Sequence, residues 1–264
     1  MLLVNLMMML FLRVPSHLPT SSRVSSLRLF SSTSPPSSSS SSSTPSPPLE
    51  GPTIMPLNDK TLPTLLSRLH SDSLIALPTE TVYGLASPLT AAGVAKVYAM
   101  KRRPASNPLI LHFADASSAL LYASTSGPQS ETVSTLASAF WPGPLTLILP
   151  LNPSLVPPYV TGGSSLLSNP TVGLRVPSHP TCSSLLSSYG LPVAMPSANV
   201  YNHVSPTEPG HVVGEFPGED LAVVDGEGGG VESTIVRVED DGGCLVLRPG
   251  VIEVEDIRGL GLEA

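Results

Sequence analysis

Cysteine is scarce in this sequence: the two residues, Cys182 and Cys244, belong to no CxxC pattern and to no Cys/His pattern with metal-ligand spacing. A zinc site and a disulfide framework are therefore not indicated, and we expect both thiols to be buried as small apolar side chains. The GxxxxGKS/T motif is also missing, which excludes a P-loop as the holder of a nucleotide. The glycine-rich run at 226–230 precedes a predicted strand at 233–238 rather than a helix, so it is not a dinucleotide-binding fingerprint.

Acidic residues are absent before Glu50, and this first stretch differs in character from the rest of the chain. It begins with an apolar, methionine-rich run, carries Arg13, Arg23 and Arg28, and becomes rich in serine and proline from residue 31 onward. Transit peptides have this composition, and the serine-proline tract has too little apolar surface to offset the entropy of ordering it. We therefore predict a transit peptide and disordered linker over residues 1–50 and one folded domain over residues 51–264.

The destination of this leader is predicted from the sequence RLFSS at 28–32, which resembles a mitochondrial processing site. A serine-rich, acid-free leader is also common to plastid import, so a plastid is the first alternative and a cytoplasmic pool is another. The apolar run at 1–12 is too short for a membrane span, which needs about 20 residues. It also lacks a small-residue cleavage site, which disfavours a secretory signal. No membrane association is expected.

The charge of the predicted domain is negative, with 10 Lys and Arg against 19 Asp and Glu after residue 50, a net charge of −9. Proteins that bind nucleic acid through many phosphate contacts are usually basic, so stable RNA or DNA binding is not expected. A compact anionic ligand is compatible with this charge. One cation about 4 Å from a phosphate in a partly shielded cleft contributes up to about 4 kcal/mol, which outweighs an acidic background screened beyond roughly 8 Å.

The pattern of apolar residues predicts an α/β fold, a mixed sheet with helices packed against it. Helical spacing predicts a helix that Thr61 caps, with Pro63 in its first turn. Further helices are predicted at 91–102, 114–123, 131–141 and 178–188. Apolar runs bounded by turn residues predict strands at 74–77, 109–113, 145–151, 172–176, 193–195, 221–224, 235–238 and 245–247.

The segment KRRPASNPLILHF at 101–113 gathers three cations, an amide and an imidazole around a predicted helix-to-strand junction. This pattern favours an anion-binding site, especially since the hydroxyl-rich segment LPTETVYGL at 77–85 lies just before the same helix. The alternative is that the cations only complement the negative C-terminal end of the helix. Within these segments we read Arg102 as solvated, and Glu80, taken without its context, as a solvated charge.

Arg175 lies inside the apolar strand predicted at 172–176, where an unpaired guanidinium would be costly. It therefore needs an anionic partner. Two partners fit a guanidinium: the carboxylate of a substrate, held by two parallel hydrogen bonds, or an acidic side chain in a structural salt bridge.

Seven blocks in this order resemble the YrdC family of threonylcarbamoyl-AMP synthases. They are PTETVYGL, KRRPASNPLILH, FWPGPLTLIL, VGLRVP, PSANVYNHVSPT, ESTIVRV and LRPG, spanning about residues 77–250. The resemblance implies a twisted mixed sheet with flanking helices around a positively lined cavity, in the single-domain form of the family.

The resemblance also implies an activity, that of a nucleotidyltransferase. L-threonine, bicarbonate and ATP, the last accompanied by Mg²⁺, would give threonylcarbamoyl-AMP and pyrophosphate for the N6-threonylcarbamoyladenosine modification of tRNA. A tRNA threonylcarbamoyl transferase would be the downstream partner, and no protein metal site is expected. The alternatives are an RNA-binding module of the same fold without turnover and a carbamoyltransferase-type maturation factor.

The family's site residues carry over onto matching positions of this sequence. Those implied to contact threonine are Thr79, Thr81, His112, Arg175, Ser233 and Thr234. Those implied to contact ATP are Lys101, Arg103, Asn107, Thr146, Ser197, Asn199, Ser205 and Arg248, of which Lys101 and Arg103 are the catalytic candidates. We expect the charged heads of Lys101, Arg103, Arg175 and Arg248 to converge on one pocket.

One block departs from the family's common SANxSG pattern, because Tyr201 and Asn202 stand where Ser and Gly are frequent. Asn can adopt the left-handed conformation that Gly would supply. The effect of Tyr201 on the geometry of this loop stays open from the sequence.

Overall fold

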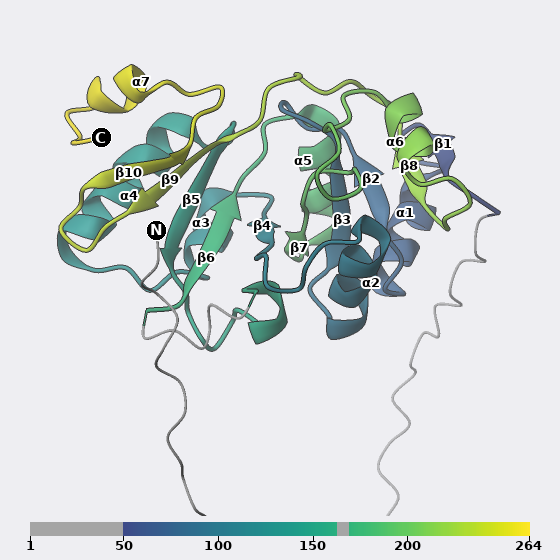
Figure 1. Ribbon diagram of the computed structural model, residues 1–264, viewed down its shortest axis with the longest axis horizontal. Helices are drawn as coiled ribbons and strands as arrows, with labels where there is room; N and C mark the ends of the chain where they lie inside the picture. The colour runs from purple at the N-terminus through teal and green to yellow at the C-terminus, as the bar shows by residue number, and fades with distance from the viewer. Residues whose placement is uncertain (1–49, 163–168) are drawn as a thin grey trace, which may run out of the picture. The chain divides into compact units, whose positions relative to one another are not determined.

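The computed structural model describes residues 50–162 and 169–264 (Figure 1). The predicted leader therefore lies outside the described residues, apart from its last position. None of the helices within these two ranges is long and apolar enough to cross a bilayer.

The architecture is a mixed ten-stranded sheet, counted over the described residues, in the order β1-β8-β2-β3-β7-β4-β6-β5-β9-β10. The β1–β8, β2–β8, β4–β6 and β5–β9 pairs are parallel, and the other neighbours are antiparallel. The α/β fold class is thereby confirmed. The strands are β1 Thr53–Met55, β2 Ile75–Leu77, β3 Gly84–Pro88, β4 Ile110–His112, β5 Leu145–Pro150, β6 Thr171–Arg175, β7 Val193–Ala194, β8 Ala222–Val224, β9 Thr234–Val238 and β10 Cys244–Arg248.

Each helix expected from the sequence is present, and two short helices accompany them. The helices are α1 Leu62–His70, α2 Ala91–Lys101, α3 Ala116–Leu120, α4 Gly127–Phe140, α5 Pro180–Tyr189, α6 Pro209–Glu215 and α7 Val254–Arg258, with a 3-10 turn at Pro158–Val160. Thr61 precedes α1, yet its hydroxyl donates to the Pro56 carbonyl and bonds no N–H of the first turn, so the predicted side-chain cap is wrong. In α2 the Thr90 hydroxyl does cap, accepting from the Gly93 N–H at 3.0 Å.

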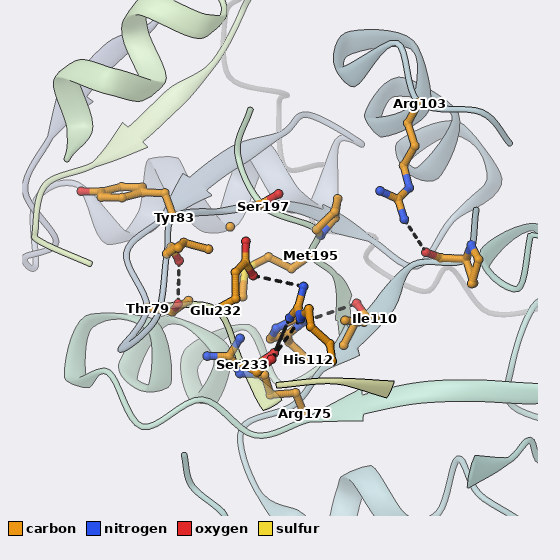
Figure 2. A pocket seen from close by; sticks show the side chains of 15 residues that line it. Thr79, Tyr83, Arg103, Ile110, His112, Arg175, Met195, Ser197, Glu232 and Ser233 are labelled. Atoms are coloured by element: carbon orange, nitrogen blue, oxygen red, sulfur yellow. Dashed lines mark hydrogen bonds and ion pairs between the residues drawn. The ribbon is translucent and has the colours of Figure 1, made fainter. Parts of the chain in front are cut away.

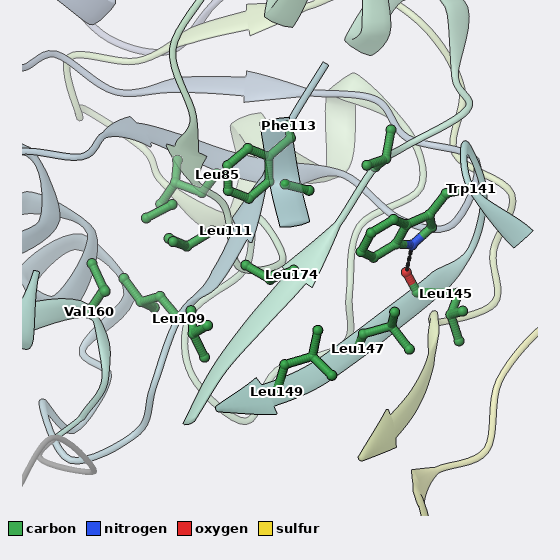
Figure 3. Packing of buried hydrophobic residues seen from close by; sticks show 14 of the residues in the cluster. Leu85, Leu109, Leu111, Phe113, Trp141, Leu145, Leu147, Leu149, Val160 and Leu174 are labelled. Carbon is green, nitrogen blue, oxygen red and sulfur yellow. Dashed lines mark hydrogen bonds between the residues drawn. The ribbon is translucent and has the colours of Figure 1, made fainter. Parts of the chain in front are cut away.

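The apolar side chains form two clusters on opposite faces of the sheet. On one face, Leu65 of α1 and Leu185 of α5 pack against Ile75 and Leu77 of β2. The larger cluster, on the other face, brings helices α2, α4 and α6 against the sheet, and Figure 3 shows its centre around Leu174. In Figure 1, α3 and α4 lie behind strands β6, β5, β9 and β10.

The alternation of side chains along β4 and β6 determines where the candidate site lies. These strands run parallel, with Leu111 opposite Leu174 and His112 opposite Arg175. Successive residues of a strand point to opposite faces, so the two leucines enter the larger cluster while His112 and Arg175 leave the sheet on the other side. Val193 of β7, which pairs with His112, belongs to the α1–α5 cluster. The two polar side chains therefore share the face of the sheet on which α1 and α5 lie.

We predict that Leu174→Ala lowers the free energy of unfolding by about 2–5 kcal/mol, because it opens a cavity in the larger cluster. Leu174 is 0% exposed between β4 and β5. Urea unfolding of the full chain measures the change. Leu245→Ala is the matched control, since Leu245 of β10 is 45% exposed and its truncation should change stability by no more than about 0.5 kcal/mol. Equal losses in the two variants would contradict this account of the core.

Candidate active site

A cavity of about 120 Å³ lies beside the ends of β4 and β6 (Figure 2). Half of the residues inferred from the sequence line it: Thr79, Arg103, His112, Arg175, Ser197, Ser233 and Arg248. Sequence reasoning missed Tyr83, Met195 and Glu232, which also line it. Three arginines from three distant parts of the chain therefore line one small space, which suits an anionic ligand.

The guanidinium of Arg175 is held by the hydroxyl-rich turn that precedes β3. Its Nη2 donates to Glu80 Oε1 at 2.8 Å and to Thr81 Oγ1 at 2.9 Å. The Thr81 hydroxyl in turn bonds that of Thr79 at 2.9 Å. The structural salt bridge considered for Arg175 is thus present, and the interpretation of Glu80 as a solvated charge is wrong. Arg175 Nε is buried and makes no hydrogen bond among the described residues, so it keeps donor capacity.

The glycine-rich run at 226–230 supports this turn. Gly230 N–H donates to the Thr81 carbonyl at 2.7 Å, and the Tyr83 hydroxyl donates to the Gly226 carbonyl at 2.8 Å. A Cβ on Gly229 would lie 2.0 Å from the Glu80 carbonyl oxygen, so only glycine permits this approach. The run therefore acts by packing against the turn that carries Glu80 and Thr81, a role that its composition alone did not reveal.

Lys101 does not line the cavity but lies behind the segment that carries Ser197. Its side chain is 1% exposed, and its ammonium donates to the Ser197 carbonyl and, at 2.6 Å, to the Asn199 carbonyl. These carbonyls do not belong to α2, so this ammonium does not simply cap its own helix. Of the four charged heads expected to converge, three line the cavity, and Lys101 instead fixes the segment that carries Ser197.

Burial lowers the pKa of Lys101 to about 7, with the nearby charge of Arg103 acting in the same direction. Glu215 and Glu232 oppose this shift. His112 is also buried, and its Nδ1 lies 3.3 Å from the Ile110 carbonyl. Desolvation, followed by the charge of Arg175, holds the pKa of His112 well below its usual value, so this imidazole is neutral at pH 7.

Tyr201 joins the loop that follows β7 to the segment between α2 and β4. The Arg103 guanidinium lies over its ring, 5.7 Å from the centroid, and Asn107 Nδ2 donates to its hydroxyl at 2.9 Å. Arg103 Nη2 also donates to the Pro108 carbonyl at 3.0 Å. Asn202 has a φ of 68°, the left-handed conformation expected of it. The departure from the common pattern therefore creates a contact to Arg103 and Asn107, and Asn107 itself does not line the cavity.

Ser233 lines the cavity and connects the side chains of Thr146 and Arg248. Its hydroxyl bonds the Thr146 hydroxyl at 2.9 Å and accepts from Arg248 Nη2 at 2.9 Å. The next residue, Thr234, donates its hydroxyl to the Ile252 carbonyl at 2.7 Å. Thr146 and Thr234 therefore support this wall from outside the cavity lining.

Glu232, next to Ser233 in the sequence, also lines the cavity. Its Oε1 accepts from Ser205 Oγ at 2.7 Å, and its Oε2 lies 3.3 Å from Arg248 Nη1. Asn199 Nδ2 donates to the Val200 carbonyl at 2.8 Å, so its amide shapes its own loop. Ser205 and Asn199 are thus brought beside the cavity without lining it.

Comparison with known proteins shows the family. Residues 67–250 match the model of the Sua5/YciO/YrdC family, which carries the description "Telomere recombination". The chain therefore belongs to the Sua5/YciO/YrdC family, which confirms the resemblance inferred from its sequence blocks.

Two curated relatives are threonylcarbamoyl-AMP synthases. The chain is 42% identical to that of Bacillus subtilis, over 77% of this chain and 57% of the relative, and 39% identical to that of Pyrococcus abyssi, over 72% and 54%. A solved structure of Pyrococcus abyssi Sua5 complexed with L-threonine matches with a TM-score of 0.69 and 34% identity, covering 80% of this chain and 60% of that one. The chain thus spans about half the length of the curated relatives it matches. The roles of the individual site residues stay predictions.

We predict that stability rises with pH between about 7 and the ordinary pKa of lysine because of Lys101. In this window the unfolded chain binds a proton that the folded chain does not, so raising the pH favours folding. Lys101→Met should flatten this dependence, measured as the free energy of urea unfolding from pH 6.5 to 10. Lys96→Met, at an exposed position of the same helix, should keep it. Parallel curves for the wild type and Lys101→Met would show that Lys101 does not titrate in this way.

Proposed function

We propose that this protein is an L-threonylcarbamoyladenylate synthase, which forms threonylcarbamoyl-AMP and pyrophosphate from L-threonine, bicarbonate and ATP. The observation that carries the proposal is the convergence of Arg103, Arg175 and Arg248 on one cavity whose walls include the hydroxyls of Thr79 and Ser233. Both reactants of the adenylation step are anionic, and guanidinium groups bind carboxylate and phosphate through paired hydrogen bonds. Family membership and 42% identity to the synthase of Bacillus subtilis support the same assignment.

Threonine is assigned to the side of the cavity formed by the Thr79–Thr81 turn, His112, Arg175 and the Ser233–Thr234 segment. The Pyrococcus abyssi Sua5 structure, by its description, holds L-threonine. In this chain Arg175 Nη2 already donates to Glu80, and Arg175 also lines the cavity. The substrate carboxylate would therefore share this guanidinium with Glu80 rather than replace it.

ATP is assigned to Arg103, Ser197 and Arg248, with support from Lys101 and from the other predicted nucleotide-side residues, Asn107, Thr146, Asn199 and Ser205. In the proposed reaction, a carbamate oxygen of N-carboxythreonine attacks the α-phosphate and pyrophosphate leaves. Alignment of the two reactants contributes about 7–11 kcal/mol, and fixed cations stabilise the charge that develops at phosphorus. Arg103 supplies such a cation at the cavity, and Lys101 supports it by holding the Ser197 carbonyl in place.

Mg²⁺ is proposed to enter with the triphosphate, held by phosphate oxygens and water. Within the described residues, no group of three or more His, Cys, Asp or Glu side chains is placed to hold a metal ion. A tRNA threonylcarbamoyl transferase is the proposed consumer of the product.

The full chain should release pyrophosphate from ATP only when threonine and bicarbonate are both present. Arg103→Ala and Arg175→Ala should each lower this rate by about 100-fold or more, because each removes a cation that contacts a reacting anion. Arg102→Ala is the matched control, since Arg102 is exposed beside Arg103 and does not line the cavity. A coupled pyrophosphate assay measures all three variants. Equal pyrophosphate release without threonine would overturn the substrate assignment.

Residues 1–50 are proposed to direct the protein to mitochondria, with plastids and a cytoplasmic pool as the alternatives. The arginine-containing, acid-poor composition before Glu50 supports this proposal. Residues 1–50 fused to a fluorescent protein should co-localise with a mitochondrial dye in living cells. The control fusion carries Glu in place of Arg13, Arg23 and Arg28 and should remain diffuse, whereas co-localisation of the unaltered fusion with plastids would contradict the mitochondrial assignment.

A further inference from the structure

Glu232 is the one acidic side chain among the described residues that line the cavity. It faces the same space as Arg103, Arg175 and Arg248, and Figure 2 shows it at the centre of the view. Its side chain is 37% exposed. A carboxylate in this position is accessible to a ligand and lies among groups that otherwise select for negative charge.

The position of this carboxylate is set by rigid neighbours. The Glu232 carbonyl accepts from the Val251 N–H at 3.3 Å, and a Cβ on Gly250 would lie 2.3 Å from that carbonyl oxygen. The side chain is held by Ser205 and Arg248 through the contacts described above. Glu232 is therefore presented to the cavity by the segment just before β9 and the segment after β10.

L-threonine in water carries an ammonium group as well as a carboxylate. The guanidinium groups suit its carboxylate, whereas its ammonium needs an acceptor of negative charge. Glu80, which lies close to the cavity, is already engaged by Arg175 at 2.8 Å and by the His179 N–H at 3.3 Å. Glu232 has the weaker cationic contact, at 3.3 Å, and it lines the cavity itself.

We propose that Glu232 binds the α-ammonium group of threonine and then accepts a proton from it, an inference that rests on the proposed function. The N–H bond breaks and its proton moves to a carboxylate oxygen of Glu232, which leaves a neutral amine. The amine lone pair forms a C–N bond with bicarbonate, while a C–O bond breaks and the departing hydroxide takes a second amine proton as water. The products are the carbamate anion and water, and Glu232 returns its proton to solvent.

The test compares two ligands and two variants of the full chain by isothermal titration calorimetry. The ligands are L-threonine and 2,3-dihydroxybutanoate, in which a hydroxyl replaces the amine. The wild type should prefer threonine by about 10- to 100-fold, the usual value of a hydrogen bond between charged groups. Glu232→Gln should reduce this preference to about twofold or less and leave binding of 2,3-dihydroxybutanoate unchanged, which also shows that the variant is folded. Glu227→Gln, the same change of charge at an exposed position of the glycine-rich run, should keep the full preference.

A pH profile of pyrophosphate release separates proton transfer from simple binding. At saturating threonine, Glu232→Gln should be slower than the wild type at pH 7, and the difference should shrink as hydroxide removes the ammonium proton at higher pH. An unchanged threonine preference in Glu232→Gln would overturn the proposal. Tighter binding of both threonine and pyrophosphate to this variant would also overturn it, because it would show that Glu232 only competes with anionic ligands for Arg248. A wild type that neither binds threonine nor needs it for pyrophosphate release would instead overturn the proposed function itself.

Discussion

The buried guanidinium of Arg175 is the constraint around which the candidate site is built. A cation at the end of an interior strand requires a counter-charge within hydrogen-bond distance, and Glu80 supplies it from the turn before β3. That turn keeps its place because the glycine-rich run packs against it. A single desolvated charge thus joins three segments that are far apart in the sequence, and the cavity lies where they meet.

The electrostatics of the cavity are local and differ from those of the protein as a whole. Residues 51–264 carry net negative charge, yet three arginines line a space of about 120 Å³. Over this short range their field is little screened, whereas the acidic groups of the outer surface act through water and salt. The same cavity includes one carboxylate, so it presents both signs of charge, as recognition of a zwitterion requires.

Much of the fold could be predicted from the sequence because most strands are continuous apolar runs with turn residues at their ends. Strand β3 was not predicted, since its sequence GLASP contains glycine, serine and proline, which are poor strand formers. It forms because β2 and β7 pair with it on both sides and its residues are buried, which is a tertiary effect. Helices α6 and α7 were also missed: α6 has the sequence PGHVVGE, which contains proline and two glycines, and α7 has the sequence VEDIR, which has only two apolar residues.

The site was predictable where a charged residue stands in an otherwise apolar strand, as Arg175 does. The hydrogen-bond partners of the Lys101 ammonium were not predictable, because the sequence shows a cation at the end of a helix but not which carbonyls lie beside it. Glu232 carried no separate signal, since an acid next to Ser233 is ordinary until β9 and β10 place it in the cavity. Tyr201 was recognised as unusual, yet its partners Arg103 and Asn107 are set by tertiary packing.

The contacts of Lys101 and Tyr201 also have a dynamic consequence. The Lys101 side chain donates to the Ser197 and Asn199 carbonyls, and the Lys101 carbonyl accepts from the Tyr201 N–H at 2.8 Å. The Asn107 amide donates to the Tyr201 hydroxyl. These hydrogen bonds join residues 101–107 to residues 197–201, which lie about a hundred positions later in the sequence. Local opening on this side of the cavity must break all of these bonds together, so the amide protons of both stretches should exchange with solvent as one cooperative event.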